Sequence, residues 1–83
     1  MDIIYSHQSL KDLKKLDKQI QKRIVQKLEF YVSQSDPLQS ADKITDPSFG
    51  EWRFRIGDYR ILFDVKEKRI IILKIGHRRE IYK

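Results

Sequence analysis

The spacing of the apolar residues changes once along this chain, and the change divides it into a helical part and a strand part. Between Leu10 and Val32 apolar side chains recur every three or four residues, which is the period of amphipathic helices. From Trp52 to Val65 they alternate with other residues, which is the period of strands with one buried face. Segregated helices and strands are typical of an α+β domain.

Two helices are expected before residue 37. A short β-branched and aromatic strand at Ile3–Tyr5 is followed by Ser6, a good N-cap for the first helix. Asp17 can cap the second helix, and a tight junction there makes a helical hairpin. Asp36-Pro37 ends the second helix, because a residue before proline disfavours helical angles. The predicted buried stripes are Leu10, Leu13 and Leu16 in the first helix, and Ile20, Ile24, Leu28 and Tyr31, flanked by Val25 and Val32, in the second.

A three-stranded antiparallel meander is expected after Gly50, preceded by a loop over residues 37–50. Gly57-Asp58 has the chemistry of a tight hairpin turn, Glu67-Lys68 forms a second turn, and Arg69–Ile75 is the third strand. The predicted fold is a two-layer β-α-α-β-β-β domain in which the helical hairpin packs on a small antiparallel sheet. The chain length allows one domain, residues 1–83.

Positive charge is concentrated in the meander. Residues 51–83 contain ten basic and five acidic residues, which is +5 of the net +6 charge. Such a surface attracts polyanions, which include nucleic acid, anionic membranes and acidic proteins. Guanidinium groups interleaved with aromatic rings favour a phosphate-bearing partner with unstacked bases.

Several classes of function are excluded by composition. The chain has no cysteine, which removes disulfides, thiolate zinc sites and cysteine nucleophiles and favours a reducing compartment, so we expect a cytoplasmic protein. The longest apolar run, Ile70–Leu73, is far too short to span a membrane. Two histidines far apart in sequence do not predict a metal site, and no cofactor is expected.

Two groups of residues are candidates for chemistry. Arg53 and Arg55 share the polar face of the first meander strand, and Arg60 follows the turn, so the three can converge on one phosphate backbone. The alternative is a solvated strand face whose charges prevent aggregation. The tail after the third strand contains an imidazole that titrates near neutrality and a phenol, at His77 and Tyr82. The alternative interpretation of this segment is a charged tail that only keeps the protein soluble.

Two segments, Trp52-Arg53-Phe54-Arg55-Ile56-Gly57-Asp58-Tyr59-Arg60-Ile61-Leu62-Phe63 and Ile75-Gly76-His77-Arg78-Arg79-Glu80-Ile81-Tyr82, resemble the RelE/ParE superfamily of toxin–antitoxin toxins, most closely the RelE-like mRNA interferases. The resemblance covers the whole chain, and the G-D-Y-R and G-H-R-x-x-x-Y elements are its most specific parts. It implies a toxin that inhibits translation as a ribosome-dependent endoribonuclease, cleaving mRNA in the decoding site without a metal. It also implies a cognate antitoxin as partner.

The resemblance also implies roles for individual residues. In this chemistry the ribose 2′-hydroxyl attacks the adjacent phosphate, and the protein must stabilise the charge that develops. Arg53 and Arg55 stand where RelE has lysines, and a guanidinium is a poor proton acceptor, so His77 is the first candidate for proton transfer and Glu51 the second. The implied catalytic residues are Arg60, Arg78, His77 and Tyr82, and the implied RNA or phosphate contacts are Arg53, Arg55, Arg79 and Lys74.

Two other functions remain compatible with the same residues. ParE-like relatives share the fold and act as inhibitory binding proteins on DNA gyrase, without a nuclease site. A toxin relative that has lost activity and only binds its antitoxin is the third possibility.

Overall fold

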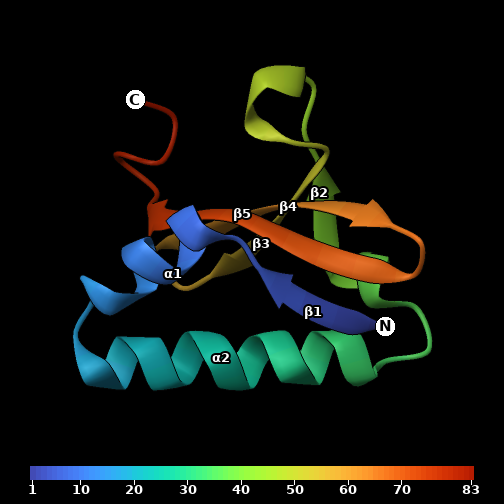
Figure 1. The fold of residues 1–83 in the computed structure, drawn as a ribbon, viewed down its shortest axis with the longest axis horizontal. Helices are drawn as coiled ribbons and strands as arrows, with labels where there is room; N and C mark the ends of the chain where they lie inside the picture. Colours follow the sequence, from blue (N-terminus) through green and yellow to red (C-terminus); the bar gives the residue numbers. More distant parts are fainter.

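The helices cover one face of a five-stranded sheet in the computed structural model, which describes residues 1–83 (Figure 1). The two-layer α+β prediction is therefore confirmed. In chain order the elements are β1 Asp2–Tyr5, α1 His7–Lys14, α2 Lys18–Ser33, a 3₁₀ turn Pro37–Ser40, β2 Ala41–Lys43, a 3₁₀ turn Pro47–Phe49, β3 Trp52–Ile56, β4 Tyr59–Lys66 and β5 Arg69–His77.

The sheet contains the predicted meander and two further strands. The strand order is β1-β5-β4-β3-β2, and β3, β4 and β5 form the antiparallel meander with turns at Gly57-Asp58 and Glu67-Lys68. β1 pairs with β5 in parallel, so the sheet is mixed. β2 lies within the segment predicted as a loop and pairs antiparallel with β3. Three residues are too few for a recognisable side-chain pattern, and backbone pairing with β3 defines this strand.

Both predicted helix caps are present. The Ser6 hydroxyl accepts a hydrogen bond from the Ser9 amide at 3.0 Å, and the Asp17 carboxylate accepts one from the Gln19 amide at 2.8 Å. α2 ends at Ser33, before the predicted stop at Asp36-Pro37. The Ser33 hydroxyl donates to the Phe30 carbonyl at 2.7 Å, a local bond that competes with continuation of the helix.

The core lies between α2 and the sheet. Ile24 and Leu28 of α2 are fully buried, and an aromatic stack continues from the helix into the sheet. Tyr31 stacks on Phe54 with ring centroids 4.8 Å apart, and Phe54 stacks on Phe63 at 4.4 Å. The predicted stripe of α2 thus packs on the sheet, and the strands contribute most of the buried residues of the core.

α1 lies beside the edge of β5, and this placement corrects one prediction. Leu13 and Leu16 pack against the core, but Leu10 is 41% exposed. Residues spaced by three rotate progressively around a helix of about 3.6 residues per turn, so the first of the three lies at the margin of the buried stripe. A carboxylate oxygen of Asp12 accepts a hydrogen bond from the Ile75 amide at 3.0 Å, satisfying a strand-edge donor beyond the end of β1. Neither helix is long and apolar enough to cross a membrane.

The left-handed backbone conformation of the Glu67-Lys68 turn can be tested by substitution. Both residues have positive φ, 52° and 62°, which is the left-handed region that favours glycine. We expect Lys68→Gly to raise the free energy of unfolding by about 1 kcal/mol, because a non-glycine residue pays about 1–2 kcal/mol there. Urea denaturation measures the change. Lys66→Gly, in the adjacent strand, is the control and should lower stability; an equal loss in both variants would contradict the turn geometry.

Candidate functional site

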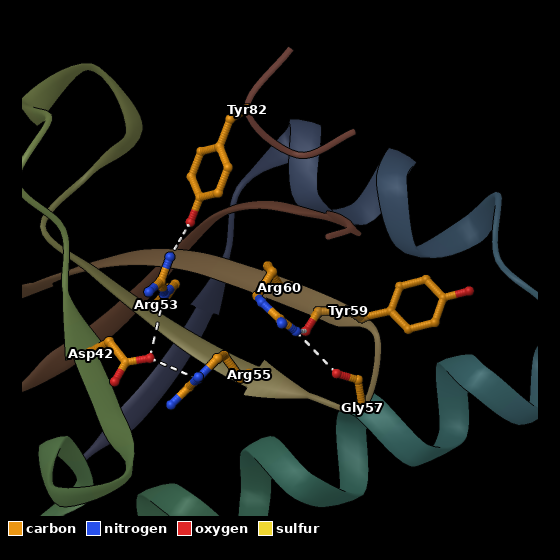
Figure 2. Close-up of polar contacts among 7 residues, drawn as sticks. All are labelled: Asp42, Arg53, Arg55, Gly57, Tyr59, Arg60 and Tyr82. Atoms are coloured by element: carbon orange, nitrogen blue, oxygen red, sulfur yellow. Dashed lines mark hydrogen bonds and ion pairs between the residues drawn. The ribbon is translucent and has the colours of Figure 1, made fainter. Parts of the chain in front are cut away.

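The face of the sheet away from α2 carries the predicted arginines. Phe54 is buried in the core, so strand alternation places its neighbours Arg53 and Arg55 on the opposite, uncovered face. Arg60 is on the same face, because it pairs directly with Arg55 across β3 and β4. We call this side of the sheet the open face. Figure 2 shows the three side chains gathered there.

Asp42 of β2 lies between two of these arginines. One of its carboxylate oxygens is 3.3 Å from Arg53 Nε and 2.9 Å from Arg55 Nε, so a single oxygen pairs with both guanidinium groups (Figure 2). The β2–β3 register sets this contact by placing Asp42 opposite Arg53. Sequence reasoning missed Asp42, since it was assigned to a loop.

Tyr82 joins the same cluster from the tail. Arg53 Nη1 donates to the Tyr82 hydroxyl at 2.8 Å, and the Tyr82 ring meets Phe49 edge-on at 5.0 Å between centroids. The hydrogen bond to Tyr82 is the main reason that the pKa of Arg53 is raised, and Asp42 adds to the effect while burial opposes it. Arg53 therefore remains a cation and cannot serve as a proton acceptor.

Arg60 and Arg78 are both attached to the turn between β3 and β4. Arg60 Nη1 donates to the carbonyls of Gly57 and Tyr59, each at 3.0 Å. The Arg78 amide donates to the Asp58 carbonyl at 2.7 Å, and its Nε is 3.8 Å from the Asp58 carboxylate. The turn thus brings together two arginines that are eighteen positions apart in the sequence.

The tail lies over the open face, where Ile81 packs against Gly76 of β5. Leu62 points away from the helices yet is only 1% exposed, as is Ile81 of the tail. A Cβ atom on Gly76 would come within 3.0 Å of Ile81 Cδ1, so a larger residue would require the Ile81 side chain to shift away from β5. Burial of Ile81 places Tyr82 next to β3.

A hollow of about 400 Å³ adjoins Arg53 and Tyr82. Its walls combine cations with an aromatic edge, which suits a nucleotide better than an apolar ligand. It is lined by Lys43, Ile44, Thr45, Asp46, Phe49, Arg53 and Tyr82.

The structure places His77 on the side of the sheet opposite the arginines of β3 and β4. His77 pairs with Tyr59 in the register of β4 and β5, and the two rings meet edge to face at 5.6 Å on the side of the sheet that faces the helices. Its Nδ1 accepts a hydrogen bond from the Arg79 amide at 3.1 Å. Of the remaining candidates, Lys74 pairs with Leu62 and so shares the open face, whereas Arg79 is exposed without an ion-pair partner.

The structure offers no group of residues for metal binding. No three histidine, aspartate or glutamate side chains are placed to hold a metal ion. Glu51, the second candidate for proton transfer, is exposed, and its amide donates to the Asp64 carboxylate at 2.8 Å.

Fold and site together define a class of small α+β domains in which a helical pair covers one side of a meander and arginines gather on the other. A model of the ParE toxin of type II toxin–antitoxin systems, parDE, matches residues 3–82. The chain therefore belongs to the RelE/ParE family of toxins from type II toxin–antitoxin systems.

Two solved structures are similar over nearly the whole chain. The toxin–antitoxin complex RelBE2 from Mycobacterium tuberculosis matches with 24% identity and a TM-score of 0.77, covering 93% of this chain and 96% of that one. The RelB–RelE antitoxin–toxin complex from Methanococcus jannaschii matches with 29% identity and a TM-score of 0.71, covering 95% and 94%. A search of curated protein sequences gave no significant match. The RelE-type fold expected from the sequence is confirmed.

The contact between Gly76 and the tail can be tested by adding volume. Gly76→Val should lower the free energy of unfolding by about 1–3 kcal/mol, because the added methyl groups overpack the space held by Ile81. Amide exchange at Ile81, whose amide donates to the His77 carbonyl at 3.0 Å, should become faster. Gly76→Ala should give a smaller effect of the same sign. Unchanged exchange at Ile81 in the valine variant would show that the tail is held elsewhere.

Proposed function

We propose that this toxin is a metal-independent endoribonuclease that cleaves mRNA in the ribosomal decoding site and so inhibits translation. The proposal is based on the composition of the open face. Arg53, Arg55 and Arg60 lie together with Tyr82 on a side of the sheet that no helix covers. Such a surface matches a single RNA strand, whose phosphates need cations and whose bases need a stacking partner.

Arg60 is the best placed group for the reacting phosphate. Its guanidinium donates only to backbone carbonyls and forms no ion pair, so its charge is not neutralised by a carboxylate. The two carbonyl contacts fix the side chain in advance, which is the condition for effective stabilisation of the charge that develops when the 2′-hydroxyl attacks. Arg78, fixed at the same turn, is the second cation for this phosphate.

Tyr82 is suited to hold a base beside the scissile bond. Its side chain is part of the hollow next to Arg53, and the residue is 37% exposed. The bond from Arg53 and the contact with Phe49 restrict its orientation, which lowers the entropic cost of stacking on a base.

The arrangement supports catalysis by positioning and charge more than by a protein base. His77 lies on the side of the sheet facing the helices, so we assign it to holding the tail through the Arg79 amide. An arginine site without an adjacent imidazole suits an enzyme whose substrate the ribosome places in a reactive geometry.

Replacement of Arg60 tests the proposal directly. Expressed in a translating extract, Arg60→Ala should reduce mRNA cleavage about 10²–10³-fold, the usual cost of removing a group that stabilises developing charge. Mapping of mRNA 5′ ends measures the cuts. Arg69→Ala is the matched control, because Arg69 lies at the other end of β5 and pairs only with Glu67. Equal cleavage by the two variants would remove Arg60 from the site.

The role assigned to His77 gives a separate prediction. His77→Ala should lose activity through a looser tail, with the shape of the pH–rate profile unchanged, since the imidazole does not face the arginines. A limb of the wild-type profile that disappears in the variant would restore His77 as a proton-transfer group.

A cognate antitoxin is the proposed regulator. The similar structures from Mycobacterium tuberculosis and Methanococcus jannaschii are both toxin–antitoxin complexes. An acidic or amphipathic segment laid over the open face would neutralise its arginines and exclude RNA.

Inhibition of DNA gyrase is the second candidate function. It is favoured by the match of residues 3–82 to the ParE toxin model, since ParE-like relatives act on gyrase without a nuclease site. A supercoiling assay separates the two functions. Loss of supercoiling without RNA cleavage favours gyrase, and inactivity of the folded chain in both assays favours a toxin relative that only binds its antitoxin.

A further inference from the structure

The Asp42 carboxylate occupies a position that a phosphate oxygen would take on the open face. One oxygen lies 3.3 Å from Arg53 Nε and 2.9 Å from Arg55 Nε. The shorter distance is typical of a charge-assisted hydrogen bond to a carboxylate or a phosphate. The two guanidinium groups already share one anion in the unliganded protein.

We infer that the Asp42 carboxylate competes with RNA phosphates for Arg53 and Arg55. Only an RNA strand that is bound at several points displaces it. The inference rests on the proposed function and deepens it, because it names the residue that sets how selectively the site binds RNA. Asp42 thus acts on specificity through Arg53 and Arg55, without touching the reacting atoms.

The contrast between the arginines supports this inference. Arg53 and Arg55 share a carboxylate, whereas Arg60 on the neighbouring strand has only carbonyl partners. A phosphate reaching Arg60 meets a cation with no carboxylate partner, while one reaching the pair competes with Asp42 for the Nε donors of Arg53 and Arg55. A strand bound at a single point therefore benefits little from the pair.

Displacement of Asp42 requires only a small rearrangement. The Asp42 side chain is 36% exposed and that of Arg55 is 60% exposed, so both groups are open to solvent. Ion pairs of this kind are weak, and a phosphate can replace one without opening the core. Because backbone pairing with Arg53 holds Asp42 in place, the carboxylate can rotate away while the strand stays paired.

Binding of a non-reactive RNA tests the inference apart from cleavage. The probe is a short single-stranded 2′-O-methyl oligonucleotide, which lacks the attacking hydroxyl, and the variants are Asp42→Asn and Asp36→Asn. Asp36 is the matched control, because its exposed side chain forms neither a cap bond nor an ion pair. At low salt Asp42→Asn should bind about three- to fivefold more tightly, the upper part of the range that an exposed ion pair allows. Asp36→Asn should change the affinity by less than about twofold through its charge alone.

Salt dependence and a second substitution identify the route of the effect. In Asp42→Asn the slope of log affinity against log salt should steepen by about 0.7 for each additional phosphate of the single strand that the arginines neutralise. In an Arg55→Gln background the tighter binding caused by Asp42→Asn should become smaller, because Arg55 forms the shorter of the two ion pairs of Asp42 while the pair with Arg53 remains. Equal affinities of the Asp42 and Asp36 variants, weaker binding by Asp42→Asn, or tighter binding that persists fully without Arg55 would each overturn the inference.

A measurement on the wild-type protein tests the same inference if Asp42→Asn does not fold. The Nε–H resonance of Arg55 should shift as the oligonucleotide saturates the protein, because its partner changes from carboxylate to phosphate. An unchanged resonance at saturation would overturn the inference. Tighter binding by Asp42→Asn without mRNA cleavage by the wild type would support the inference about Asp42 and refute the proposed nuclease activity.

Discussion

The need to bury β4 on both faces determines where the rest of the molecule lies. Phe63 packs beneath α2, and its neighbour Leu62 is just as inaccessible on the opposite face. No helix covers that second face, and the tail lies over it with Ile81 buried against Gly76 of β5. The same contact places Tyr82 within hydrogen-bonding distance of Arg53. The polar geometry of the site is thus a consequence of burying the middle strand of the meander.

The open face contains a pair of like charges that destabilises the sheet. Arg55 and Arg60 pair directly across adjacent strands, and like charges in that position destabilise. Each has a separate hydrogen-bond partner: the carboxylate of Asp42 for Arg55, which offsets its charge, and the neutral carbonyl of Gly57 for Arg60, which orients the side chain. A small domain has only a few kcal/mol of net stability, so retention of this repulsion is typical of a functional surface.

Most of the architecture could be predicted from the sequence, because side-chain periodicity directly specifies which face of an element is buried. The stripe of α2, the meander and its two turns followed from that rule. Asp42 could not be found, since β2 exists only through backbone pairing with a distant strand. His77 was grouped with the tail, but its spacing of two from buried Ile75 was a signal that it continues β5 and faces the helices.

The position of β5 in the sheet has a consequence for synthesis of the protein. β5 lies between β1 and β4. Its pairing with β1 places Arg69 opposite Asp2, which is most of the chain length away in sequence. The helices and the β3–β4 hairpin use local contacts, but the sheet cannot close before β5 has been made. Tyr82, which completes the arginine cluster, emerges later still. A nascent chain therefore carries no assembled open face until translation has passed its last strand and tail.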